Sequence, residues 1–159
     1  MTSKLHNYVM ALFFILSSTT ASAQEDESLM TYDLATRAME AAEAYAREQG
    51  WNVTILITDQ NNSVVMVRRL DGAGARTWDF ATAKALAVNE TGLSSGEYGR
   101  RILAQEIEEV EGAVTFAGGV PVFVNGQRIG AIATSGVRAN QDEEVSIAGA
   151  ETIGSTSSN

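Results

Sequence analysis

The dipeptide Asn125-Gly126, flanked on both sides by apolar runs, constrains the fold of this chain more than any other feature. Asn-Gly favours a two-residue type I′ turn, because such a turn needs two positive φ angles. Residues 121–124 and 128–134 are therefore predicted to form paired antiparallel strands. Pro121 suits the first position of a strand, where its missing N–H costs least.

The first 23 residues have the layout of a signal peptide. Lys4 precedes a short apolar run at residues 8–16, and Ala-Ser-Ala at residues 21–23 fits a cleavage site. The apolar run is too short for a bilayer-spanning helix, which needs about 20 apolar residues. We expect cleavage before Gln24, a periplasmic or secreted protein, and no membrane association after cleavage.

Four parts make up the chain in this interpretation: a signal peptide (1–23), a flexible acidic N-terminus (24–30), a single domain (31–153) and a polar tail (154–159). Apolar periodicity predicts the element order α-β-β-α-α-β-β-β-α. One of the five strands is predicted at residues 113–116. Because the close strand pairs have short connections, we predict an α/β (α+β) fold with an antiparallel five-stranded sheet and packed helices.

Composition excludes several kinds of chemistry. The only histidine, His6, lies in the predicted signal peptide, and the chain has no cysteine. The mature chain therefore cannot contain a Ser-His-Asp triad, a cysteine nucleophile or an ordinary zinc site, and no metal site is predicted. Acidic residues outnumber basic ones by 20 to 11, which argues against nucleic acid as a partner.

Lys84 and Asp71 are the candidate catalytic residues. Lys84 lies in an alanine-rich apolar helix, where desolvation would lower its pKa and suit proton transfer. Asp71 and Arg69 follow the second strand, where Asp71 could act as a base and Arg69 could bind a carboxylate. The alternatives are that Lys84 reaches water or pairs with Asp71 or with an acidic residue across an interface, and that Asp71 only makes a turn.

Gly118 and Gly119 are candidate ligand-binding residues, because a glycine pair can present backbone N–H groups to an anion. The alternative is an ordinary tight turn before the hairpin. Asp142 begins an acidic run of three residues that could bind a metal, but acids in the first turn of a helix explain the run better. Asn140 is the predicted N-cap of that helix.

Five segments of the chain, in order, resemble the GlcG/HbpS-like (haem-degrading) family. They are the alanine-rich first helix, VTILITDQNNSVVMVRRLDGA, FATAKALA, AGGVPVFVNGQRIGAIATSG and QDEEVSIAGAE. The family is related to the C-terminal domain of the PduO corrinoid adenosyltransferase. The resemblance implies a five-stranded antiparallel sheet, a homo-oligomer and, in some members, haem binding.

The resemblance also implies how this chain departs from haem-binding members. Val67 stands where those members have a threonine, whereas the nearby arginine is present as Arg69. We therefore predict an exported, oligomeric protein that binds a small organic ligand or a tetrapyrrole, with weak haem binding. Two alternatives stay open: a metal-independent acid–base enzyme acting on a small carboxylated substrate, and a structural accessory protein.

Overall fold

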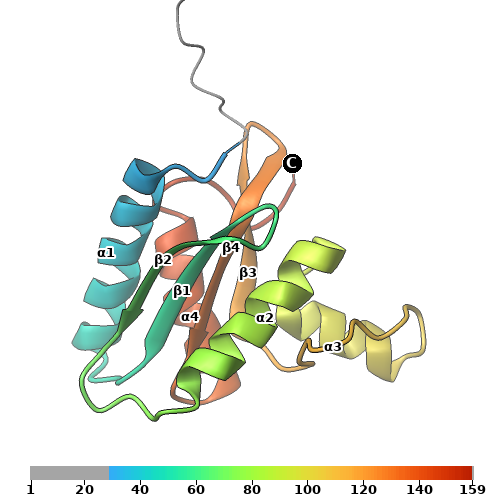
Figure 1. Ribbon diagram of the computed structural model, residues 1–159, viewed down its shortest axis with the longest axis horizontal. Helices are drawn as coiled ribbons and strands as arrows, with labels where there is room; N and C mark the ends of the chain where they lie inside the picture. Colours follow the sequence, from blue (N-terminus) through green and yellow to red (C-terminus); the bar gives the residue numbers. More distant parts are fainter. Residues whose placement is uncertain (1–28, 159) are drawn as a thin grey trace, which may run out of the picture.

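The computed structural model describes residues 29–158, so the predicted signal peptide and most of the acidic N-terminus lie outside the described residues. Four helices and four strands follow one another along this part of the chain (Figure 1). They are α1 (Tyr32–Glu48), β1 (Thr54–Asp59), β2 (Val64–Arg69), α2 (Thr77–Thr91), α3 (Ser95–Leu103), β3 (Gly119–Val124), β4 (Gln127–Ser135) and α4 (Ala139–Ala150).

All four strands belong to one antiparallel sheet with the order β2-β1-β4-β3. The predicted hairpin is confirmed as β3 and β4. Its turn residues Asn125 and Gly126 have φ values of 51° and 77°, the two positive angles that an Asn-Gly turn supplies. Strand β4 lies between β1 and β3, so the hairpin forms one half of the sheet.

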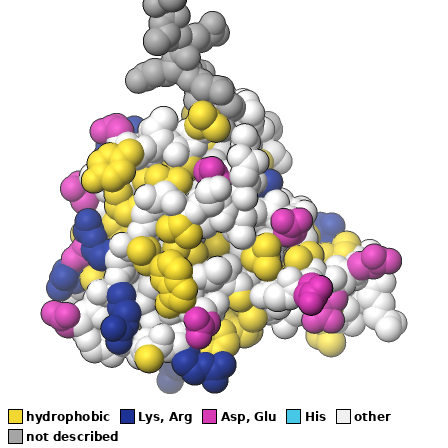
Figure 2. Space-filling model, viewed as in Figure 1, with side chains coloured by type: hydrophobic (Ala, Val, Ile, Leu, Met, Phe, Trp, Pro, Cys, Tyr) yellow, Lys and Arg dark blue, Asp and Glu magenta, His cyan; other side chains and the backbone are white. Residues whose placement is uncertain are grey.

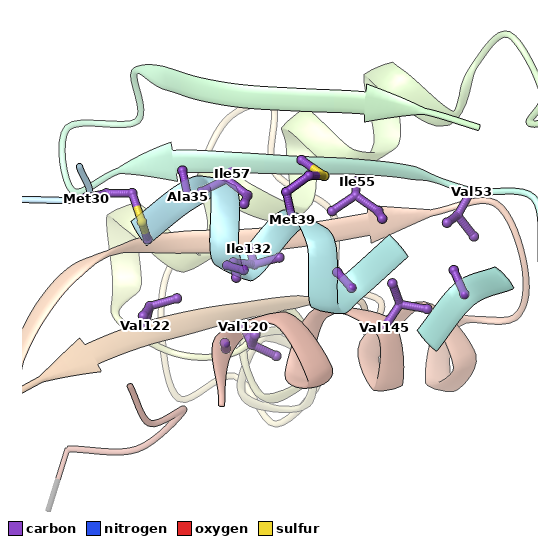
Figure 3. Close-up of a cluster of buried hydrophobic side chains, with 14 of the residues drawn as sticks. Met30, Ala35, Met39, Val53, Ile55, Ile57, Val120, Val122, Ile132 and Val145 are labelled. Atoms are coloured by element: carbon purple, nitrogen blue, oxygen red, sulfur yellow. The ribbon is translucent and has the colours of Figure 1, made fainter. Parts of the chain in front are cut away.

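Helices cover both faces of the sheet. Helices α1 and α4 pack on one face, where the larger cluster of buried apolar side chains includes Met39, Ile57 and Ile132 (Figure 3). Helix α2 packs on the other face, where Leu56 meets alanines of α2 and β4 in a smaller cluster. Both faces of β1 are therefore buried.

The predicted fifth strand at residues 113–116 is wrong, although the α+β class with an antiparallel sheet is confirmed. Residues 104–118 form neither helix nor strand. This segment packs against α3 instead: a Cβ added at Gly99 would lie 1.8 Å from the Thr115 carbonyl oxygen. Because Gly99 has no side chain, the segment has room to pack closely against α3 and does not join the sheet.

The outer edge of β3 is already occupied by other groups. The Gly119 N–H donates to Ser95 Oγ at 2.9 Å, and Pro121 has no N–H. Phe123 exchanges two backbone hydrogen bonds with Ser155, at 2.8 and 2.9 Å. The C-terminal tail therefore occupies the outer edge of β3, one of the two edges of the sheet where a fifth strand could pair.

Helix α3 ends at Leu103, because Gln105 adopts a left-handed φ of 59°. The start of the last helix differs from the predicted one. Helix α4 begins at Ala139 with Arg138 at the N-cap, so Asn140 lies inside the helix. Among the helices of residues 29–158, none combines the length and the apolar character needed to cross a bilayer.

Candidate functional site

Lys84 is the centre of a buried polar cluster. Its side chain is fully buried, and its Nζ donates to Asp142 Oδ2 at 2.7 Å and to the Thr134 carbonyl oxygen at 2.8 Å. Ser146 Oγ, from α4, donates to the Gly118 carbonyl oxygen at 2.7 Å and lies 2.9 Å from Thr134 Oγ1. We call Lys84, Thr134, Asp142 and Ser146 the polar cluster.

The Lys84 side chain links the two helix layers. Lys84 belongs to α2 on one face of the sheet, and Asp142 belongs to α4 on the other. Its stem lies against Gly119, where an added Cβ would be 3.1 Å from Lys84 Cβ. Its Nζ occupies the space that a side chain at Gly118 would take, since an added Cβ there would be 2.4 Å away.

Burial shifts the pKa of both members of this ion pair. Burial lowers the pKa of the Lys84 ammonium, and the nearby Asp142 carboxylate opposes that shift. Burial likewise raises the pKa of Asp142, against the effect of Lys84 and of the Val137 N–H, which donates to Asp142 Oδ1 at 3.0 Å. Both shifts have the direction of groups removed from water, which fits an internal ion pair that holds the fold.

Glu143 and Phe116 lie at the outer side of the polar cluster. The Phe116 ring, 40 % exposed, has its centroid 5.2 Å from Lys84 Nζ and stacks edge-on with Phe80. Burial raises the pKa of the Glu143 carboxyl, which Arg100 and a hydrogen bond with Ser94 oppose. Phe116 thus shields the lysine from solvent with a ring rather than with a polar group.

The other predicted site residues do not join Lys84. Arg69 donates to the Ala73 carbonyl oxygen. Asp71 is exposed and lines a small cavity of about 250 Å³ together with Trp51 and Arg47. As an alternative, the sequence analysis paired Lys84 with Asp71 or with an acidic residue across an interface, whereas its partner is Asp142 of the same chain. The roles of Lys84 and Asp71 in catalysis stay predictions.

Gly118 and Gly119 leave the space that the Lys84 side chain of the polar cluster occupies. Gly118 has a φ of 129°, which favours glycine, and its carbonyl oxygen also accepts from the Thr134 N–H at 2.8 Å. The N–H of Gly119 is bound to Ser95. The glycine pair therefore makes room for a lysine; an anion-binding role stays a prediction.

A second feature is an apolar strip on the outer face of the sheet beside α2. We give this name to Val64, Val67 and Trp78, which are 48 %, 41 % and 40 % exposed. Val64 and Val67 pair with Thr58 and Leu56, so their side chains are on the α2 face. Helix α2 packs on β1, β3 and β4 and leaves this face of β2 open.

Trp78 is the member of the strip that belongs to α2. It lies three turns before Asn89 on the same side of the helix. That side faces β2, because Asn89 Nδ2 donates to Thr58 Oγ1 at 2.8 Å, next to the β1–β2 turn. Arg69, paired with Thr54, points to the same face of the sheet as Val67. Hydrophobic side chains accordingly gather over the sheet beside α2 (Figure 2). The sequence analysis did not find this surface, although alternation along β2 could have indicated it.

An open cleft of about 560 Å³ lies at the far end of the hairpin. Phe123, Val124 and Ile153 contribute apolar groups to it, and Ser155 and Ser157 contribute polar ones. Within residues 29–158 there is no group of three or more acidic, histidine or cysteine side chains that could hold a metal ion. The strip and this cleft are two described surfaces that present apolar side chains to an organic ligand.

A comparison with known protein families shows which family the chain belongs to. The family described as "Haem degrading protein HbpS-like" matches residues 30–151. The chain belongs to this family. The resemblance seen in the five sequence segments is therefore confirmed. An uncharacterized 15.0 kDa protein of Citrobacter freundii, from the dhaT-dhaS intergenic region, is 27 % identical over 119 residues, which are 71 % of this chain and 84 % of that protein.

Solved structures of other proteins share the fold. A double mutant of Streptomyces reticuli HbpS is 27 % identical with a TM-score of 0.73, covering 95 % of this chain and 99 % of that one. The PduOC:heme complex is 20 % identical with a TM-score of 0.67, covering 79 % and 95 %. At that identity, the second likeness shows the shared fold alone.

Proposed function

We propose that this HbpS-like protein binds a small organic ligand, with haem as the first candidate, on the apolar strip of β2 and α2. The observation that carries the proposal is the exposure of Val64 and Val67 on the face of the sheet that α2 packs on, together with the exposure of Trp78 on α2 itself. The family description and the haem complex of a protein with the same fold support the choice of candidate.

The strip has the chemistry that a flat carboxylated ligand needs. Trp78 offers an indole for stacking, and the two valines offer an apolar floor. Arg69 is exposed at the end of β2, and its guanidinium can bind a carboxylate through two parallel hydrogen bonds. Such a ligand would have its ring over the strip and its carboxylate near Arg69.

Haem bound in this way would lack a strong axial ligand. Residues 24–159 contain neither histidine nor cysteine, so no imidazole or thiolate is available to the iron. Affinity would come from apolar contact and from Arg69. We therefore expect weak binding and an absorption spectrum without the features of bis-histidine low-spin haem.

Absorption titration with hemin tests the proposal, with Trp78→Ser as the variant. Loss of the stacking surface should weaken binding about tenfold, which corresponds to roughly 1.4 kcal/mol. Tyr32→Ser is the matched control, because Tyr32 is 73 % exposed on α1, on the opposite face of the sheet. Arg69→Gln should weaken hemin binding without affecting a porphyrin that lacks carboxylates.

Equal hemin affinities in Trp78→Ser, Tyr32→Ser and the unmodified protein would refute the proposed site. If Trp78 has no effect but Phe123→Ser weakens binding, the cleft at the hairpin is the site instead. Phe123 lines that cleft and is not part of the strip.

Export and self-assembly belong to the same proposal. Residues 1–23 would direct export and be removed, leaving a periplasmic or secreted protein. The sheet exposes large apolar side chains on an otherwise acidic protein, which supports assembly into a homo-oligomer.

A further inference from the structure

The small cavity beside Asp71, of about 250 Å³, is not part of the apolar strip. It lies where α1 ends, β1 begins and β2 ends. Pockets for drug-sized ligands usually measure roughly 300–1,000 Å³, so this cavity suits a smaller molecule. The end of α1, the connection to β1 and the connection after β2 line the cavity, through Arg47, Gly50, Trp51, Asn52, Leu70 and Asp71.

A tight turn holds Asp71 at the cavity. The Ala73 N–H donates to the Leu70 carbonyl oxygen at 3.1 Å, and Gly72 has a φ of 86°, as expected for the third residue of a type II turn. The Leu70 N–H donates in turn to the Val53 carbonyl oxygen at 2.9 Å, which fastens the turn to the sheet. Within residues 29–158, the Asp71 carboxylate has neither an ion pair nor a hydrogen bond, so it is available to a ligand.

Arg47 supplies a positive charge whose position is set by its neighbours. Its Nε donates to Glu43 Oε1 at 2.6 Å, and the other carboxylate oxygen of Glu43 accepts from Arg68. One carboxylate is therefore shared by two guanidinium groups, which leaves an excess of positive charge beside the cavity. The terminal nitrogens of Arg47 have no partner within residues 29–158, and such a pair of N–H donors matches a carboxylate.

Trp51 provides an aromatic wall at the end of α1. Its N–H donates to the Ala46 carbonyl oxygen at 2.9 Å, and its ring contacts Tyr45 edge-on, with the ring centroids 6.1 Å apart. An indole attracts a cation over its face, and the C-terminal end of a helix carries a partial negative charge. Both effects favour an ammonium group at this wall, on the side of the cavity that also holds an apolar surface.

We propose that the small cavity binds a free amino acid, with its ammonium group against Asp71 and Trp51 and its carboxylate against Arg47. Arg47 and Asp71 are the charged residues of the lining, one of each sign. A singly charged ligand would leave one of them without a partner, whereas a zwitterion satisfies both. An apolar side chain of the amino acid would lie against Leu70 and the indole. The proposal does not rest on haem or on the apolar strip.

Isothermal titration calorimetry with three related compounds tests the choice of ligand. L-Valine carries both charges and an apolar side chain, isovalerate lacks the ammonium group, and isobutylamine lacks the carboxylate. The purified protein should bind L-valine at least about tenfold more tightly than either analogue, because each analogue loses one charge-assisted contact. Equal affinity for L-valine and one analogue, or no binding of L-valine at about 10 mM, would overturn the proposal.

Two variants test the location of the site. Asp71→Asn and Arg47→Gln should each weaken L-valine binding about tenfold or more, because each removes one of the two charges. Asp79→Asn and Arg37→Gln are the matched controls and should leave the affinity unchanged. Asp79 is an exposed carboxylate on α2, and Arg37 pairs with an acidic residue four positions before it on α1, as Arg47 does. A control that weakens binding as much as its partner variant would place the ligand elsewhere.

Fluorescence gives a second measurement at the cavity itself. The chain has two tryptophans, so in a Trp78→Phe background the emission reports Trp51 alone. L-Valine should change this emission, and isobutylamine at the same concentration should change it less. Circular dichroism establishes that each variant is folded; if Arg47→Gln is not, Arg47→Lys replaces it and should also weaken binding, because lysine lacks the paired donors. Binding of L-valine without a change in Trp51 emission would contradict the proposed site.

Discussion

Replacing Lys84 by methionine should destabilise the protein severely. Methionine keeps most of the side-chain volume but leaves the Asp142 carboxylate, whose side chain is 4 % exposed, without its cation. The Thr134 carbonyl oxygen loses its donor at the same time. Removing one partner of a buried ion pair typically costs about 3–5 kcal/mol, which corresponds to a decrease in Tm of about 10–20 °C for a domain of this size.

A second substitution distinguishes the ion pair from simple packing. Adding Asp142→Asn to Lys84→Met removes the uncompensated charge and keeps an acceptor for the Val137 N–H. The double variant should therefore be at least as stable as Lys84→Met alone. Glu90→Met is the matched control: it removes an exposed charge from the same helix and should change the free energy of unfolding by less than about 0.5 kcal/mol.

Urea denaturation of these three variants, of Asp142→Asn alone and of the unmodified protein gives these free energies directly. The reasoning fails if Lys84→Met costs less than about 1 kcal/mol, or if the two substitutions destabilise additively. A stable Lys84→Met variant that loses ligand binding would instead favour the catalytic or binding role predicted from the sequence.

Three further predictions concern other parts of the chain. Gly118→Ala should cost about 2–4 kcal/mol in urea denaturation, because its Cβ would collide with Lys84 Nζ and its φ is left-handed. Hydrogen bonds from Arg68 and then Arg47 lower the pKa of Glu43 below its ordinary value near 4.5. Glu43→Gln should therefore destabilise the protein at neutral pH in urea denaturation. This difference in stability should disappear as the pH falls through the pKa of Glu43 in the folded state. The intact mass of the exported protein should be that of a chain that begins at Gln24. A mass that still includes residues 1–23 would contradict export.

Local sequence signals predicted the elements whose geometry is set by neighbouring residues. Asn125-Gly126 fixed the hairpin because the turn depends only on those two residues and their flanks. The segment at residues 113–116 was misread because its apolar content also suits packing against a helix. Only the fold reveals that Gly99 provides room for Thr115 there.

The polar cluster shows what a single sequence cannot supply. Lys84 and Asp142 are 58 residues apart, and no spacing rule connects them. The alanine-rich setting of Lys84 correctly indicated burial, but its partner depends on how α2 and α4 lie on opposite faces of the sheet beside Gly118. The apolar strip was hidden for a related reason, since exposure of Val67 and Trp78 depends on which strands α2 covers.

The pairing of the tail with β3 has a consequence for how the protein should be handled. Ser155 satisfies the outward backbone groups of Phe123, and Pro121 offers no donor, so this edge of the sheet cannot recruit another strand. A purification tag joined directly to the tail, or removal of the residues after Ile153, would strain or delete that cover. Aggregation during expression would then start at Phe123 and its apolar neighbours, even though the core of the domain would be unchanged.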